Sequence, residues 1–205
     1  YVNDRPHIGT SYTSIACDIF ARYQKLKGNK VYFLTGTDEH GQKVQNAAKL
    51  KNKTPKEFTD KMSKNFKNLV DYLNCKNNDF IRTTETRHQE SAKALWKILE
   101  KNNQIYLDKY KGWYSVRDEA YYDEKEIVEK DNNFYAPTGS KLEWVEEESY
   151  FFKLSKWQDK LLDFYEKNEN FILPKSRRNE VISFVKSGLK DLSVSRKSFS
   201  WGIQV

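Results

Sequence analysis

Helical and strand-like patterns alternate at the front of this chain, and this alternation is what most constrains its fold. Residues 8–26 place apolar side chains at helical spacing and are followed by Gly28, a residue typical of helix ends. Residues 31–38, VYFLTGTD, are rich in β-branched and aromatic residues, and residues 39–50 have a helical pattern again. Such alternation favours a parallel sheet covered by helices. We therefore expect an α/β fold whose first strand lies mostly before residue 1.

A different pattern of elements is expected in the second half of the chain. Before it, Thr54, Pro55 and Glu57 form a capping box with proline at the first helical position, and another helix is expected at residues 85–101. Beyond residue 103 the predicted elements are a hairpin, a short acidic helix, a turn-rich loop, a strand and two helices, at residues 105–116, 121–130, 132–144, 150–154, 155–167 and 174–186. This change predicts a boundary near residue 104, between a sheet domain at residues 1–103 and an inserted α+β part at residues 104–205.

Charge and cysteine content narrow the expected partners and location. Lys and Arg outnumber Asp and Glu by 36 to 29, which gives a net charge of +7. That charge suits a polyanionic partner, although lysines on solvated helix faces explain it equally well. No apolar run approaches the roughly 20 residues needed to cross a bilayer, so no membrane partner is expected. Cys17 and Cys75 offer no disulfide framework, which fits the bacterial cytoplasm or an organellar matrix.

Two loops are expected to face one site. VNDRPHIG and TGTDEHG would each follow a parallel strand, and ligands bind at the carboxyl edge of such sheets. Gly9 at a helix start allows close approach of a base or phosphate, and His7 can donate to a phosphate oxygen. Asp38 suits an ammonium group. The alternative is that Pro6 and Gly9 only mark a helix start, while Asp38 and His40 cap the next helix.

Six sequence blocks, taken in order, carry a resemblance that covers essentially the whole chain. They are YVNDRPHIGT, FLTGTDEHGQKV, DFIRTTETRH, GWYSVRDEAYY, residues 144–154 and DLSVSR followed by WGI. In this order they resemble the methionyl-tRNA synthetases, a class I aminoacyl-tRNA synthetase family. Thr37 before Asp38 argues against the leucyl, isoleucyl and valyl relatives, which have tryptophan there. The resemblance implies the first half of a Rossmann-like catalytic domain with an inserted connective domain, acting in protein biosynthesis.

The resemblance also implies a reaction and roles for individual residues. The reaction is ATP- and Mg²⁺-dependent activation of L-methionine to methionyl-adenylate, followed by transfer to tRNA(Met), with no role for DNA. His7, Thr10 and Arg196 would be the catalytic residues, with Arg196 near the phosphates. The implied ATP-binding residues are Pro6, His7, Ile8, Gly9 and Thr10, and the implied methionine-binding residues are Tyr1 and Asp38.

Three positions depart from the family pattern. Thr10 stands where the family has its second signature histidine, and a threonine hydroxyl cannot carry positive charge. KMSKN at residues 61–65 looks like the family's mobile lysine loop, but Met62 falls on the apolar face of a capped helix, so we interpret the match as coincidence. Ser115 and Asp118 stand at C-x-x-C positions, so no zinc is expected there.

Two classes of function follow from these observations. His7, Gly9, Asp38 and Arg196 favour the front part of a methionine–tRNA ligase. Thr10 favours the alternative, a catalytically impaired synthetase-like module that binds tRNA or protein. Because the family's second half-domain and lysine loop are missing from these residues, we expect a fragment that is incomplete for catalysis.

Overall fold

The computed structural model describes residues 2–118, 120–197 and 199–205, with only the backbone described for Tyr110. The chain divides into two compact units. The first unit comprises Tyr1–Trp96 with Phe199–Val205, and the second comprises Lys97–Ser198. No helix in the described ranges is both long and apolar enough to cross a membrane.

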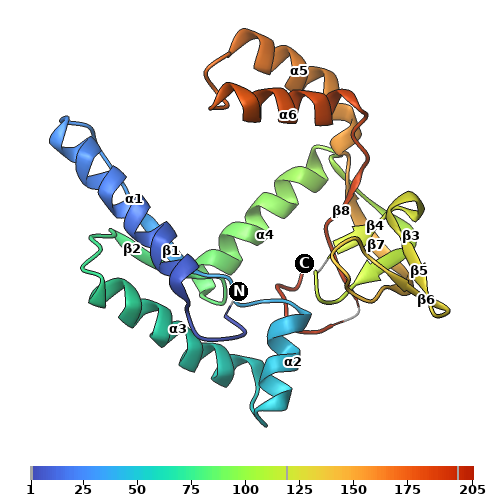
Figure 1. Cartoon of the computed structure of the whole chain (residues 1–205), viewed down its shortest axis with the longest axis horizontal. Helices are drawn as coiled ribbons and strands as arrows, with labels where there is room; N and C mark the ends of the chain where they lie inside the picture. Colours follow the sequence, from blue (N-terminus) through green and yellow to red (C-terminus); the bar gives the residue numbers. More distant parts are fainter. Residues whose placement is uncertain (1, 119, 198) are drawn as a thin grey trace. The chain divides into compact units, whose positions relative to one another are not determined.

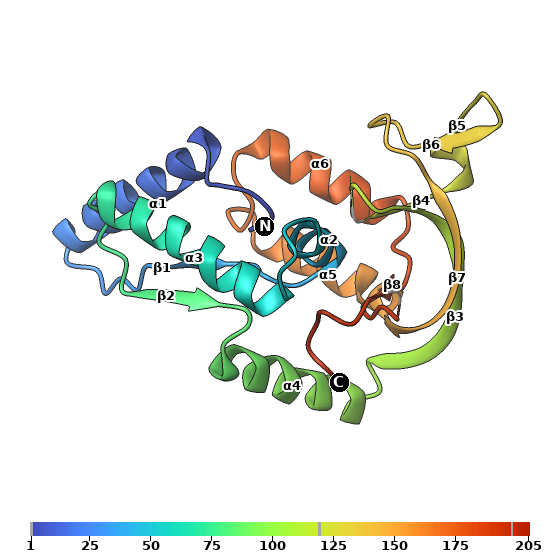
Figure 2. The same cartoon turned by 90° about the horizontal axis from the view of Figure 1, so that it is seen from below.

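The first unit is built from helices around a pair of parallel strands. Its elements are α1 (Ile8–Leu26), β1 (Leu34–Thr37), α2 (Gln42–Leu50), α3 (Pro55–Tyr72), β2 (Asp79–Arg82) and the start of α4 (Thr86–Lys101). β1 and β2 pair in parallel, with Leu34 opposite Asp79 and Thr37 opposite Arg82. Figure 2 shows α1 and α3 running along this pair of strands. The predicted α/β fold with a parallel sheet is therefore confirmed.

Capping and the burial of apolar side chains explain where α2 and α3 form. Thr54 and Glu57 make the predicted capping box at the start of α3, with proline in the first turn. The first unit contains two buried apolar clusters. One comprises Val2, Val44, Ala48, Phe58 and Met62, and the other comprises Ala21, Phe33, Val70 and Cys75. Burial of these side chains is the main source of stability for helices of this length.

The second unit is mainly antiparallel. Its elements are β3 (Ile105–Ser115), β4 (Ala120–Tyr122), the 3₁₀ turn η1 (Glu124–Glu126), β5 (Val128–Lys130), β6 (Asn133–Tyr135), β7 (Glu143–Phe152), the 3₁₀ turn η2 (Leu154–Trp157), α5 (Gln158–Lys167), α6 (Lys175–Lys186) and β8 (Leu192–Ser193). β4, β3, β7 and β8 form one sheet in that order, and β5 pairs with β6 in a separate two-stranded sheet. Figure 1 shows the long β3 and β7 side by side.

Two expectations for this unit are wrong. The hairpin expected at residues 105–116 is a single strand, because β7 supplies a continuous partner from Ile105 opposite Phe152 to Tyr114 opposite Glu143. The acidic helix expected at residues 121–130 is instead β4, the η1 turn and β5. There the capping box of Asp123 and Glu126 begins only a three-residue 3₁₀ turn. The turn-rich loop at residues 132–144 contains the short strand β6.

The division into units lies close to the predicted change of pattern. The boundary between the two units lies inside α4, between Trp96 and Lys97, and Phe199–Val205 belongs to the first unit. Trp201 packs there against the cluster that contains Val44 and Met62. That residues 104–205 form a connective insertion of a larger catalytic domain stays a prediction.

Candidate active site

The first part of the candidate site is the N-terminus of α1. His7 is the N-cap residue, and its Nδ1 accepts a hydrogen bond of 3.1 Å from the Gly9 amide. A neutral imidazole that accepts at Nδ1 carries its proton on Nε2, where it can donate to a phosphate oxygen. A β carbon at Gly9 would lie 2.9 Å from Cε1 of His7, so a larger residue there would make the exposed imidazole shift. Thr10 and Ser11 donate their amides to the His7 carbonyl at 2.9 and 3.2 Å.

This end of the helix is suited to an anion. The dipole of α1 favours negative charge at this end, although the amides of Gly9, Thr10 and Ser11 already donate to His7. His7, Ile8 and Gly9 are exposed, whereas Pro6 and Thr10 are half-buried. The structure thus brings all five residues predicted to bind ATP to one helix start.

The second part of the candidate site is the loop between β1 and α2. Asp38 is exposed, and its neighbours Thr37 and Glu39 are buried. Gly36 precedes them. This position requires glycine, because a β carbon there would lie 1.9 Å from the Ile81 carbonyl oxygen of β2. Asp38 therefore projects from the carboxyl end of a parallel strand, as predicted, and belongs to the same compact unit as the start of α1.

Glu39 is a functional candidate that the sequence reasoning missed. Its side chain is 0% exposed and receives hydrogen bonds from three residues. Arg82 donates through Nε to Oε1 at 2.7 Å and through Nη2 to Oε2 at 2.9 Å. The signal was present in the sequence, because TGTDEHG and DFIRTTETRH end adjacent strands and carry a carboxylate and a guanidinium.

Trp201 closes over the same loop from the end of the described chain. Its Nε1 donates to the Glu39 carbonyl at 2.5 Å, and its carbonyl accepts from the Gly41 amide at 3.2 Å. Its ring lies 5.4 Å from the ring of His40. Burial lowers the pKa of His40 below its usual 6.5, although Asp38 and Glu39 oppose this shift. His40 is therefore neutral at pH 7 and can serve as a hydrogen-bonding group.

The roles of two further predicted site residues stay predictions. Arg196 lies in the second unit. Its Nη1 donates to Oγ of Ser193 at 2.8 Å and to the carbonyl of Ser195 at 2.6 Å, and its guanidinium stacks 4.8 Å from the ring centre of Tyr121. Tyr1 lies outside the described residues, so its assignment to the methionine site stays a prediction.

The interpretation of KMSKN as a coincidental match is supported by its place in the fold. Residues 61–65 lie in the middle of α3, where Met62 and Ser63 are buried. Met62 packs in a core cluster, and Oγ of Ser63 lies 3.2 Å from Oγ1 of Thr37. These residues cannot act as a mobile loop without unfolding α3.

Ser115 and Asp118, which stand at the C-x-x-C positions of the family, form a hydrogen-bonded turn. Oγ of Ser115 accepts from the Asp118 amide at 3.0 Å and donates to Ser140 at 2.8 Å. The Asp118 carboxylate accepts from Thr138, Tyr122 and Ser140. These hydrogen bonds, first among them those from Ser140 and Thr138, hold the pKa of Asp118 well below its usual value. That this part of the protein binds no zinc stays a prediction.

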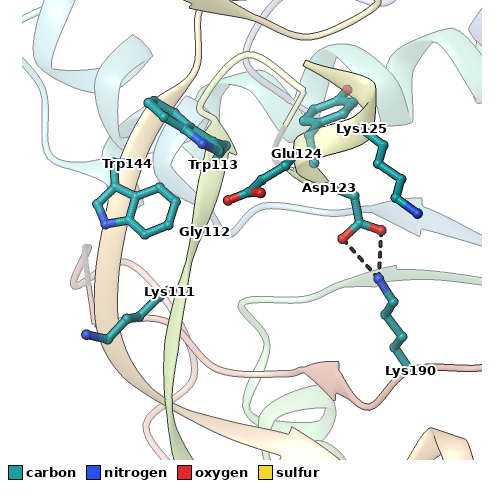
Figure 3. A pocket seen from close by; sticks show the side chains of 9 residues that line it. Lys111, Gly112, Trp113, Asp123, Glu124, Lys125, Trp144 and Lys190 are labelled. Carbon is teal, nitrogen blue, oxygen red and sulfur yellow. Dashed lines mark hydrogen bonds and ion pairs between the residues drawn. The ribbon is translucent and has the colours of Figure 1, made fainter.

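A separate cavity of about 410 Å³ lies within the second unit. Figure 3 shows Trp113 and Trp144 on one side of it and the ion pair of Asp123 with Lys190 on another. The ring centre of Trp113 lies 4.2 Å from that of Phe134, and Trp144 is 50% exposed. Lysines and carboxylates both line the cavity, and none of the predicted site residues does.

Comparison with known proteins identifies the family. A family model described as tRNA synthetases class I (M) matches residues 1–205. The chain belongs to this family. Among curated relatives, this synthetase chain is 60% identical over 205 residues to a methionine–tRNA ligase of Rickettsia bellii and 57% identical over 206 residues to one of Rhizobium meliloti. All of this chain is covered in both cases, but it spans only 40% of the length of each relative.

Solved structures agree with this assignment. The synthetase chain matches Mycobacterium tuberculosis methionyl-tRNA synthetase bound by methionyl-adenylate with a TM-score of 0.96 and 47% identity. The match covers 100% of this chain and 41% of that one. The apo form of the same synthetase matches with a TM-score of 0.79 and 44% identity, over 100% of this chain and 39% of that one. The predicted class I synthetase fold is thereby confirmed.

Proposed function

We propose that this chain is the front part of the active site of a methionine–tRNA ligase. The proposal rests on one observation above all. The chain resembles, over its full length and with a TM-score of 0.96, a synthetase bound by methionyl-adenylate. The anion-binding start of α1 and the exposed carboxylate of Asp38, which lie in one unit, fit such a ligand. Because the chain spans about 40% of its relatives, the activity belongs to the longer protein.

The first step would form methionyl-adenylate. A carboxylate oxygen of L-methionine attacks the α-phosphorus of ATP, a new P–O bond forms, and pyrophosphate leaves with the electrons of the broken P–O bond. Asp38 would hold the ammonium group of methionine, His7 would donate to the phosphates, and Gly9 would allow the adenine to lie close to the backbone. In such a reaction the protein mainly positions the reactants and stabilises phosphate charge.

In the second step a hydroxyl of the terminal ribose of tRNA(Met) would attack the methionyl carbonyl carbon, an ester bond would form, and AMP would leave. We propose that Arg196 lies near the phosphates and that Tyr1 contacts the methionine side chain. We also propose that the protein acts in the bacterial cytoplasm or an organellar matrix. The residues that the structure describes contain no group of three or more His, Cys, Asp or Glu side chains that could hold a metal. Mg²⁺ stays a proposed cofactor, and no step is assigned to it.

Methionine-dependent exchange of pyrophosphate into ATP tests the proposal, in the protein at the full length of its relatives. Methionine should stimulate exchange, and Asp38→Ala should reduce kcat/KM for methionine about 10- to 100-fold, because a charge-assisted hydrogen bond is lost. Asp71→Ala, which removes an exposed carboxylate of α3, is the matched control and should leave exchange unchanged.

Other results would argue against this function. Equal stimulation by leucine or valine would refute methionine specificity. A folded protein without exchange, not rescued by Thr10→His, would favour the module that binds tRNA or protein without catalysis.

A further inference from the structure

Glu39 has the largest side chain among the fully buried residues of the described chain. Each oxygen of its carboxylate accepts two hydrogen bonds. Oε1 accepts from Thr37 at 2.6 Å and from Nε of Arg82 at 2.7 Å, and Oε2 accepts from Nη2 of Arg82 at 2.9 Å and from Thr84 at 2.5 Å. A buried charge is tolerated only when it is paired and hydrogen-bonded in this way.

The side chain stays ionised at neutral pH. Burial by itself would raise the pKa of Glu39, but hydrogen bonds from Arg82, Thr37 and Thr84 outweigh it, and the pKa lies below its usual 4.5. Its carboxylate is therefore a permanent acceptor for the two parallel strand ends: Thr37 ends β1, Arg82 ends β2, and Thr84 follows β2.

The backbone of Glu39 is fixed as well. Its amide donates to Oγ1 of Thr83 at 2.9 Å, and its carbonyl accepts from Nε1 of Trp201 at 2.5 Å. The residue just before it, Asp38, is exposed. Both the backbone and the side chain of Glu39 are held in place. Glu39 therefore sets the direction in which the Asp38 side chain projects from the end of β1.

The network also ties the loop to α3. Nη2 of Arg82 donates to Oδ1 of Asp60 at 2.6 Å, and Asp60 pairs with Lys56 one turn earlier. Oγ1 of Thr37 lies 3.2 Å from Oγ of Ser63. Glu39 is thus anchored to β1, β2 and α3 at once, which suits a residue that must not move when a ligand binds.

We propose that Glu39 is a positioning residue for methionine activation, which holds the Asp38 carboxylate in the direction that receives the ammonium group of the amino acid. The inference rests on the proposed function, because it presupposes that Asp38 binds methionine. It assigns Glu39 no contact with the substrate.

Glu39→Gln tests the proposal by exchange kinetics in the full-length protein. The amide keeps the size of the side chain but removes the charge, and its NH₂ group faces donors from Arg82, Thr84 or Thr37. The loop should shift, and the KM for methionine should rise on the order of tenfold to 100-fold. kcat and the KM for ATP should stay within about twofold, since the start of α1 is not part of the network.

Asp18→Asn is the matched control. Asp18 is 6% exposed and belongs to the same unit. It pairs with Arg22 at 2.6 Å and accepts from the Lys76 amide at 2.6 Å. Its neutral variant should lose stability in the same way, yet leave the KM for methionine unchanged. A purely structural role of Glu39 would lower the amount of active protein, and so the apparent kcat, without moving the KM.

Thr84→Val is the second variant, for the case that Glu39→Gln does not fold. It removes one donor to Oε2 and keeps the ion pair with Arg82, so the KM for methionine should rise by about fivefold or less. Suppose that the wild type is active but the Glu39→Gln and Thr84→Val variants have the same KM for methionine as the Asp18→Asn control. This result would overturn the positioning role of Glu39 and leave the proposed function standing. A wild type without methionine-dependent exchange would overturn the proposed function and this inference with it.

Discussion

Thr10 lies in the first turn of α1, where the related synthetases are expected to place a second histidine. It is half-buried, and its amide is already bonded to the His7 carbonyl at 2.9 Å. Thr10→His should increase the rate of adenylate formation, on the order of 10²-fold if the imidazolium restores a charge-assisted donor to the phosphates. Single-turnover formation of methionyl-adenylate measures this rate.

The control for this prediction lies one turn further along the same helix. Thr13 is exposed, and its hydroxyl donates to the Gly9 carbonyl at 3.2 Å. Thr13→His adds the same imidazole to α1, away from the first turn, and should not raise the rate. An equal increase of the rate in both variants, or no increase in Thr10→His, would show that Thr10 does not stand in place of a catalytic histidine.

At the scale of residues, the sequence predicted the groups that act through one local segment. His7 and Gly9 were found because they open a helix, and Asp38 because it ends a strand. Glu39 was not found, because its role depends on Arg82 and Thr84, more than forty residues away, which only the parallel pairing of β1 with β2 brings to it.

At the scale of elements, α3 decides what the KMSKN segment does. Met62 is buried in the core of the first unit, whereas Lys61 is exposed. Met62→Ala should therefore destabilise the protein by about 2 to 5 kcal/mol, as large-to-small changes in a core do. Lys61→Ala should change the stability and the exchange rate little. Urea unfolding and pyrophosphate exchange measure the two effects.

The opposite pattern would contradict the assignment of these residues to a helix core. If Lys61→Ala removed exchange while Met62→Ala left the free energy of unfolding unchanged, KMSKN would be acting as a catalytic lysine loop.

Caps and apolar faces explain why helices were predicted better than strands. α1 spans the predicted residues 8–26, and the capping box places the start of α3. The segment that forms the long strand β3 was predicted as a hairpin, whereas in the sheet all of its paired residues from Ile105 to Tyr114 lie opposite β7. A strand's partner is a property of the fold, which a local pattern does not contain.

At the scale of the whole molecule, the first unit holds both segments of the proposed site. The chain contains the start of α1, the loop with Asp38 and the returning segment with Trp201 in one unit. It spans 40% of the length of its Rickettsia relative. The family was predictable because six blocks occur in order, whereas the position of Arg196 relative to the ATP-binding residues depends on contacts between distant parts of the chain.

A crystal structure of the full-length protein with a non-hydrolysable sulfamate analogue of methionyl-adenylate tests the central proposal most directly. We expect the ammonium group of the analogue within hydrogen-bonding distance of the Asp38 carboxylate. Its adenine should lie over Gly9, and its sulfamate should lie near His7. An analogue bound without contact to either Asp38 or the start of α1 would contradict the proposal that these two segments form the site of methionine activation.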